Sequence, residues 1–126
     1  RAIIDGVKQA GITRLLVVGG AGSLFVAPGV QLVDTPDFPP EYRQGALAAR
    51  EALNLIRTED SLDWSFVSPP AFLAPGERSG QFRIGADDLP MDGDKPAGIS
   101  VADLAVAIVD EIEQGLRLKQ RFTVSS

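Results

Sequence analysis

Three glycines follow an apolar run near the start of the chain, where backbone amides could bind the phosphates of a dinucleotide. The stretch LLVVGGAGSLFVAPG spans residues 15–29. A dinucleotide-binding turn needs G-x-G-x-x-G between a strand and a helix, with an acidic residue about 20 positions later. Gly20, Gly22 and Asp34 fit parts of this pattern, but Phe25 occupies the third glycine position, and Pro28 interrupts the crossover helix. The glycines are therefore predicted to end a later strand, where a ligand or a loop can approach the sheet.

Side chains that commonly bind metals or act as general bases are scarce in this sequence. The 126 residues contain no Cys and no His, which excludes disulfides, thiolate metal sites and histidine catalysis. Four acidic residues resemble a calcium loop in composition but not in spacing, and we expect them to be solvated: Asp87, Asp88, Asp92 and Asp94. The sequence predicts no metal site.

The overall charge argues against several classes of partner. The net charge is −5, with 44% hydrophobic residues. Nucleic acids and anionic membranes attract basic surfaces, so neither is an expected partner. No apolar run reaches the length of a membrane span, and the chain does not open with a signal peptide. We expect one cytoplasmic, globular domain.

Three predicted helices alternate with three predicted strands. The helices cover residues 1–11, then the segment from Pro39-Pro40 to Arg57, and a last segment that Ser100 and Asp103 begin as a capping box. The predicted buried stripe of this last helix is Val101, Leu104, Ala105, Ile108 and Ile112, with Asp110 exposed. Strands are expected at 15–18, 62–68 and 118–124, with a short one within 80–85. Residues 19–40 are predicted to be mainly an irregular loop.

This alternation is typical of an α/β fold that is Rossmann-like and doubly wound, with a mainly parallel sheet. Buried parallel strands need neighbours on both sides. Residues 1–126 are therefore predicted to be the C-terminal part of a single domain. An N-terminal half or another chain would complete its sheet.

Several segments, taken in order, resemble one protein family. They are AGITRLLVVGGAGSLFVAPGVQLVDTPDFPPEY, DWSFVSPPAFLAPGERSGQFRIG, ISVADLAVAIVDEIEQ and QRFTV. Together they resemble the C-terminal half of atypical short-chain dehydrogenase/reductase proteins, in the NAD(P)H-binding, NmrA-like and flavin-reductase-like branch. The family's phosphate-binding glycine motif lies near its N-terminus and has no counterpart in these residues.

The resemblance implies a catalytic Ser, Tyr and Lys, of which this chain retains two. Ser23 and Tyr42 match the Ser and the Tyr, whereas Ala46 stands in the Lys position, four residues after the Tyr. In the family the Tyr exchanges a proton with the substrate oxygen, and the Ser orients the substrate. Arg43 and Arg50 do not have the helical offset needed to replace the Lys. Alternatively, Tyr42 packs at the start of its helix and Ser23 bonds to its own backbone.

The resemblance also indicates where NAD(P)H and a small-molecule substrate would bind. The candidate cofactor-binding residues are Gly19, Gly20, Ala21, Gly22, Ser68, Pro69 and Pro70. Phe72 and Arg78 are the candidate substrate contacts. The prolines could instead simply stop the strand, and Arg78 could lie in a solvated turn. Trp64 is expected in the core.

The implied function is that of an NAD(P)-dependent oxidoreductase that transfers a hydride to a small carbonyl, quinone or flavin. Ala46 leaves open a non-catalytic NAD(P)-binding regulatory protein. A third interpretation is a fragment that is inactive without an N-terminal half.

Overall fold

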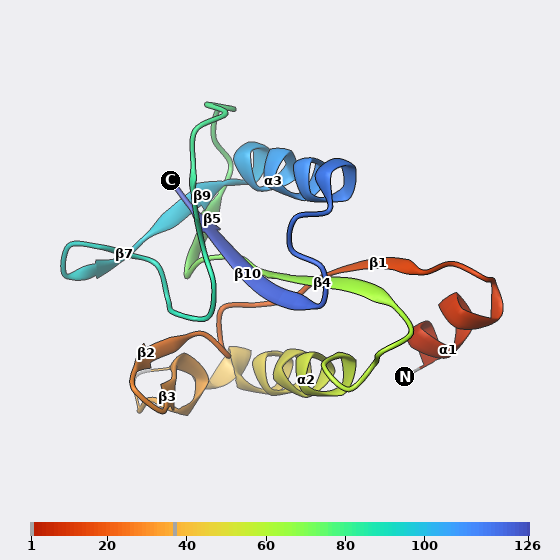
Figure 1. Ribbon diagram of the computed structural model, residues 1–126. Coiled ribbons are helices and arrows are strands. Elements are labelled where there is room, and N and C mark those ends of the chain that lie inside the picture. The colour runs from red at the N-terminus through yellow and green to blue at the C-terminus, as the bar shows by residue number, and fades with distance from the viewer. Residues whose placement is uncertain (1, 37) are drawn as a thin grey trace.

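Four strands form the central sheet, in the order β1–β4–β10–β6 (Figure 1). They are β1 (Arg14–Val18), β4 (Asp63–Ser68), β10 (Gln120–Ser125) and β6 (Arg83–Gly85). The first three run parallel, and β6 pairs antiparallel with β10. The computed structural model describes residues 2–36 and 38–126, so Arg1 of the first predicted helix lies outside the described residues. The predicted α/β fold with a mainly parallel sheet is confirmed.

Helices cover both faces of this sheet (Figure 1). Helices α1 (Ala2–Gln9) and α2 (Pro40–Ile56) pack on one face, and α3 (Val101–Gln114) packs on the other. Successive side chains of a strand point to opposite faces. Phe66 of β4 therefore packs with α1 and α2, whereas Val67 packs under α3. This two-sided burial explains why the neighbouring residues Phe66 and Val67 are both apolar.

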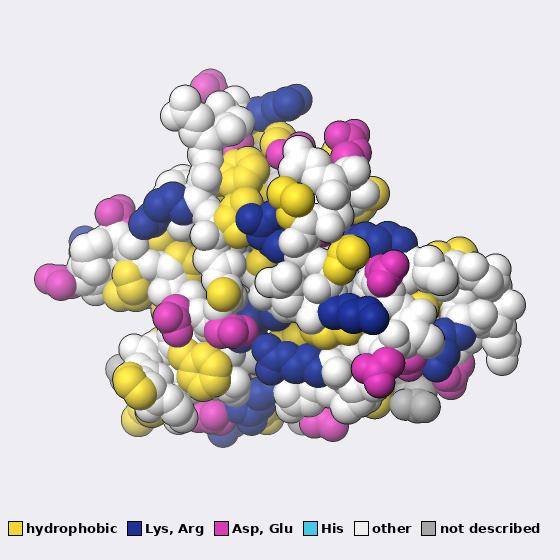
Figure 2. Space-filling model, in the orientation of Figure 1, with side chains coloured by type: hydrophobic (Ala, Val, Ile, Leu, Met, Phe, Trp, Pro, Cys, Tyr) yellow, Lys and Arg dark blue, Asp and Glu magenta, His cyan; other side chains and the backbone are white. Residues whose placement is uncertain are grey.

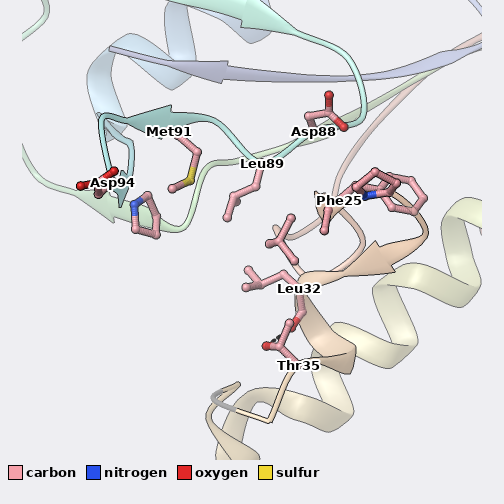
Figure 3. A pocket seen from close by; sticks show the side chains of 11 residues that line it. Phe25, Leu32, Thr35, Asp88, Leu89, Met91 and Asp94 are labelled. Carbon is pink, nitrogen blue, oxygen red and sulfur yellow. Dashed lines mark hydrogen bonds between the residues drawn. The ribbon is translucent and has the colours of Figure 1, made fainter.

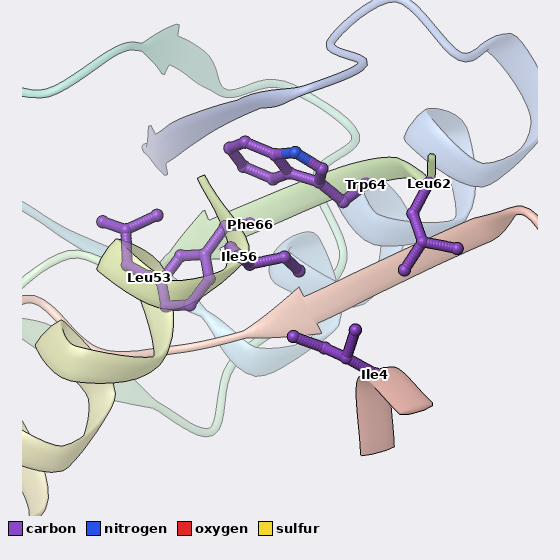
Figure 4. Packing of buried hydrophobic residues seen from close by; sticks show 6 residues of the cluster. All are labelled: Ile4, Leu53, Ile56, Leu62, Trp64 and Phe66. Carbon is purple, nitrogen blue, oxygen red and sulfur yellow. The ribbon is translucent and has the colours of Figure 1, made fainter. Parts of the chain in front are cut away.

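Two hydrophobic clusters form the core. The cluster between the sheet and helices α1 and α2 contains Ile4, Leu53, Ile56, Leu62, Trp64 and Phe66 (Figure 4). The cluster under α3 contains Val67, Ile99, Leu104, Ala107, Phe122 and Val124. Burying one large apolar side chain stabilises the fold by about 1.5–3 kcal/mol. Trp64 lies in the core, as predicted.

The predicted buried stripe of α3 is only partly correct. Leu104 is buried as expected, and Ile108 packs at the margin of the core. The other three stripe residues are exposed: Val101, Ala105 and Ile112. Ala107 and Glu111 take their places in the interior, and Asp110 is half-buried rather than exposed.

A buried ion pair explains this orientation of α3. Glu111 Oε2 accepts a hydrogen bond from Arg14 Nη2 at 3.0 Å, and Glu111 Oε1 lies 3.6 Å from Arg117 Nη1. A charged side chain can be buried when it is paired in this way. The helix therefore presents Glu111 to the sheet and exposes apolar residues that the pattern assigned to the core.

The start of α3 has the predicted N-cap. Ser100 Oγ accepts a hydrogen bond from the Asp103 amide at 3.0 Å. The Asp103 carboxylate, however, accepts from the Ser79 hydroxyl at 2.7 Å and from the Gly80 amide at 3.0 Å. The Ser79 bond, followed by the Gly80 bond, lowers the pKa of Asp103. Asp103 thus fastens the 79–80 loop to the helix.

Three pairs of short strands lie outside the central sheet. They are β2 (Phe25–Ala27) with β3 (Val30–Gln31), β5 (Phe72–Ala74) with β9 (Gly98–Ser100), and β7 (Met91–Asp92) with β8 (Lys95–Pro96). A 3-10 turn, Leu32–Asp34, follows β3. The first pair lies in the predicted irregular loop, which is more ordered than expected.

Strand β1 lies at an edge of the sheet. Within the described residues it pairs with β4 alone, and Val18 is 52% exposed. Its apolar sequence predicted a neighbour on each side, so this edge is where a further strand would fit. None of the helices in the described residues is both long and apolar enough to cross a membrane.

Candidate functional site

The ends of β1 and β4 bring the two predicted cofactor segments together. The Gly19 amide donates a hydrogen bond to the Val67 carbonyl oxygen at 2.8 Å. Residues 19–22 therefore start beside Ser68, at the carboxyl end of two parallel strands. Ligands of open α/β sheets bind outside this end. The structure places the two segments as the sequence predicted, and their role in binding stays a prediction.

The three glycines of this turn differ in what surrounds them. A Cβ on Gly19 would overlap the Phe66 ring, and one on Gly22 would lie 2.8 Å from the Ala46 Cβ. At Gly20 an added Cβ would meet nothing within 4 Å. Gly19 and Gly22 are thus needed for the protein's own packing, and Gly20 is the position open to a ligand.

The remaining predicted cofactor and substrate residues divide by exposure. Ser68, Pro69 and Pro70 are buried. The two prolines therefore restrict the backbone of the chain after β4 within the interior of the molecule. Phe72 is 61% exposed, and Arg78 is also exposed. These two side chains do not line the pocket described below, and their contact with substrate stays a prediction.

Ser23 and Tyr42 lie in different environments. Ser23 is 4% exposed, and its Oγ accepts a hydrogen bond from Arg121 Nη1 at 2.8 Å rather than bonding to its own backbone. Tyr42, in the first turn of α2, is 66% exposed. Among the described residues, no hydrogen bond joins the two. Ala46 points at Gly22, so the helix offers no cation at the Lys position.

Arg121 is the functional candidate that the sequence interpretation missed. Its side chain is 1% exposed and donates to Asp87 Oδ1 from Nε at 2.9 Å. Nη1 donates to Ser23 Oγ at 2.8 Å and to Ser68 Oγ at 3.2 Å, and Nη2 donates to the Ser23 carbonyl at 3.2 Å. Burial lowers the pKa of Arg121, and the bond to Asp87 opposes that effect. An arginine inside a strand that is otherwise buried was the available signal, since such a charge requires partners.

A pocket of about 680 Å³ opens beside these residues (Figure 3). One wall comes from the segment 25–35 and contains Phe25, Val26, Ala27, Pro28, Leu32 and Thr35. The other wall comes from the segment 88–96 and contains Asp88, Leu89, Met91, Asp94 and Pro96. In Figure 3 the side chains of Leu32 and Leu89 approach each other from opposite walls. The volume suits a small organic ligand, and the lining is mainly apolar.

The turn after β1 leaves one opening where NAD(P)H could approach the sheet. Gly20 has no atoms around an added Cβ, whereas Ser23 and Ser68 are buried and hydrogen-bonded to Arg121. The glycine-rich turn that would bind the pyrophosphate is not among the 126 residues. The described residues therefore lack the phosphate cradle, and contact of Gly20 with the nicotinamide end stays a prediction.

Metal-ligating clusters are missing from the described part of the chain, and one face of the molecule carries charges of both signs. No group of three or more Asp, Glu, His or Cys side chains there could hold a metal ion. On the face shown in Figure 2, basic and acidic side chains alternate over the surface, and apolar side chains lie between them. Such a mixed surface has no extended basic patch for a polyanion.

A family model described as NAD(P)H-binding matches residues 1–112. The uncharacterized protein YwnB of Bacillus subtilis is 46% identical over 129 residues, which cover 100% of this chain and 61% of that protein.

Solved structures are similar over nearly the whole chain. A protein from Burkholderia pseudomallei, described as a candidate exported protein, is 51% identical with a TM-score of 0.93, covering 99% of this chain and 61% of its own. A candidate NADH-flavin reductase from Streptococcus pneumoniae is 39% identical with a TM-score of 0.82, covering 90% and 55%. The chain thus spans between half and two thirds of the length of these proteins, which is consistent with a partial domain.

Proposed function

The chain belongs to the NAD(P)H-binding family of atypical short-chain dehydrogenase/reductase-like proteins, and on that premise we propose that the complete protein is an oxidoreductase. It uses NAD(P)H to reduce a small carbonyl compound, a quinone or a flavin. NAD(P)H, when bound, supplies the hydride. The residues of this chain contact the nicotinamide end and shape the acceptor pocket.

The observation that carries this proposal is the position of the pocket. Its first wall begins at Phe25, directly after the turn at Gly19–Gly22 that approaches Ser68. A mainly apolar pocket of about 680 Å³ suits an uncharged planar ring next to the nicotinamide end. The similarity to a protein named as a candidate NADH-flavin reductase supports flavin as one acceptor.

Reduction of a carbonyl adds a hydride to carbon and a proton to oxygen, so the site needs a proton donor or water. Ser23 is 4% exposed, accepts a hydrogen bond from Arg121 and does not line the pocket, so its hydroxyl is not placed to donate to an acceptor oxygen there. Tyr42 is exposed and has Ala46 where the family has Lys. We therefore expect solvent to supply the proton more readily than Tyr42.

A non-catalytic NAD(P)-binding regulator is the second candidate function. The observation that favours it is Ala46, whose Cβ packs towards Gly22 and provides no charge beside Tyr42. Such a protein would bind NAD(P)H without oxidising it. Binding and turnover measured on the same preparation separate the two functions.

The test uses the complete protein with NADH or NADPH and a panel of acceptors: a benzoquinone, riboflavin and a small aldehyde. We expect NAD(P)H oxidation that depends on one of these acceptors. Val26→Arg places a cation in the pocket wall and should raise the KM for the acceptor. Val109→Arg is the matched control, because both valines are about half-exposed and Val109 lies outside the pocket lining. Equal KM values for the two variants would contradict the pocket assignment.

A further inference from the structure

One buried cation links the two walls of the pocket. Phe122 and Val124 of β10 pack under α3, so Arg121 points to the opposite face of the sheet. Its guanidinium reaches the end of that face, where the chain after β1 and the chain after β6 meet. A buried arginine is stable only when its donors are satisfied, and four hydrogen bonds provide this.

The partners of Arg121 stand next to each pocket wall in the sequence. Ser23 lies two residues before Phe25, the first residue of one wall. Asp87 directly precedes Asp88, the first residue of the other wall. The same guanidinium therefore holds the base of both segments. Asp87 is half-exposed and also accepts from Arg57 Nη2 at 3.3 Å.

Backbone hydrogen bonds also join the two walls. The Phe25 amide donates to the Asp87 carbonyl at 2.8 Å, and the Leu89 amide donates to the Phe25 carbonyl at 2.9 Å. They connect β2 with the chain that leads from β6 to β7. Arg121 bonds Ser23 and Asp87 at the base of the same two segments.

We propose that Arg121 is a positioning residue that sets the separation of the two walls of the acceptor pocket and so keeps the backbone hydrogen bonds between them formed. The proposal rests on the proposed function for its kinetic consequences. The planar fork of a guanidinium can serve Ser23, Ser68 and Asp87 at once. A lysine ammonium keeps the charge but cannot reproduce this geometry, so Arg121→Lys loosens the walls without removing the charge.

The experiment compares Arg121→Lys with Arg14→Lys in the complete protein. Arg14 is a matched control, because it bonds Ser65 Oγ and Glu111 Oε2, each at 3.0 Å, on the face of the sheet away from the pocket. We expect kcat/KM for the acceptor to fall by roughly 10–100-fold in Arg121→Lys, mainly through KM. Arg14→Lys should lower stability and leave the acceptor KM unchanged.

Hydrogen exchange tests the positioning without any turnover. Protection of the Phe25 and Leu89 amides should fall in Arg121→Lys and stay at the wild-type level in Arg14→Lys. Unchanged protection, or equal acceptor KM values in the two variants, would overturn the proposal. If none of the acceptors supports NAD(P)H oxidation by the wild type, the proposed function fails, and the exchange result still decides the role of Arg121.

A second variant covers the case in which Arg121→Lys does not fold. Asp87→Asn alters a half-exposed side chain, so it should fold, and it weakens the bond that fixes the second wall. We expect the same direction of change in acceptor KM and in Leu89 protection, with a smaller amplitude because the Ser23 bonds remain. Wild-type values for both quantities in Asp87→Asn would contradict the proposal.

Discussion

Alanine substitution at each glycine of the turn after β1 gives a prediction that the structure makes quantitative. An added Cβ would overlap the Phe66 ring at Gly19, would lie 2.8 Å from Ala46 Cβ at Gly22, and would meet open space at Gly20. Favourable carbon–carbon contacts lie at about 3.5–4.0 Å. Gly19→Ala and Gly22→Ala therefore require a shift of neighbouring atoms, whereas Gly20→Ala does not.

The cost follows from what must shift. Phe66 is 1% exposed and packed in the core, so Gly19→Ala should reach the upper end of the roughly 1–3 kcal/mol that overpacking costs. Gly22→Ala pushes on the Ala46 methyl group of α2, and its added Cβ would also lie 3.3 Å from the Val33 Cβ, a smaller overlap than at Gly19, so it should lie in the lower half of that range. Gly20→Ala should change the free energy of unfolding by less than about 0.5 kcal/mol.

Urea denaturation of the complete protein measures the three free energies of unfolding. The expected order of destabilisation is Gly19→Ala, then Gly22→Ala, then Gly20→Ala. Calorimetric titration with NADPH adds a second readout, in which Gly20→Ala should weaken binding although its stability is unchanged. Equal denaturation midpoints for the three variants would refute the packing around this turn.

Three further predictions concern α3 and the first turn of α2. Leu104→Ala should cost about 2–5 kcal/mol because Leu104 is buried on the side of α3 that packs on the sheet; exposed Ile112→Ala should cost less than about 0.5 kcal/mol, and denaturation midpoints in the reverse order would show that the helix faces the other way. Hydrogen bonds lower the pKa of Asp103, so its stabilisation is present above the ordinary pKa of 3.8 and is lost as the pH falls through the lowered value. The urea midpoint of Asp103→Asn should thus lie below the wild type at neutral pH and approach it in acid, and a gap that does not depend on pH would contradict this role. Tyr42→Phe should lower the turnover rate by less than about tenfold, because loss of a working general acid costs on the order of a hundredfold or more; a loss of that size with unchanged folding would make Tyr42 the acid.

The alternating order of helices and strands could be predicted because those segments have strong, simple patterns. The strand at Leu15 is a continuous apolar run, the strand at Phe66 is stopped by two prolines, and α2 begins at Pro40 and is rich in helix-forming residues. The Ser100 cap was recognisable for the same reason, since its spacing to Asp103 is local. Local signals of this kind do not depend on distant parts of the chain.

Charged side chains that are buried caused the main errors. The hydrophobic pattern of α3 predicts that Glu111 faces solvent. Arg14, which lies 97 positions earlier, pairs with Glu111 and so determines which side of α3 faces the sheet. Arg121 was missed in the same way, because its partners Ser23 and Asp87 come from distant loops. The sequence shows the charges, and only the fold shows which of them are paired.

The pocket could not be predicted because its walls are built from strands of two or three residues and a 3-10 turn, which are too short to show a periodic pattern. In the sequence, Phe25 occupies the third glycine position of the dinucleotide-binding pattern, and Leu89 lies within the acidic segment 87–94. Their backbone hydrogen bonds join residues more than 60 positions apart and leave no periodic signal. Phe72 and Arg78 were predicted as substrate contacts from the resemblance to the family, and they do not line this pocket.

Acceptor-dependent oxidation of NAD(P)H by the complete protein is the decisive test of the proposed oxidoreductase activity. The measurement follows NADH and NADPH absorbance with benzoquinone, riboflavin and an aldehyde, next to a calorimetric titration of the same sample. The isolated 126 residues serve as the comparison, and they should bind NAD(P)H weakly or not at all because they lack the phosphate cradle. We expect the complete protein to bind NAD(P)H tightly and to oxidise it in the presence of an acceptor. Tight binding without turnover on any acceptor would contradict this expectation and leave the regulatory function.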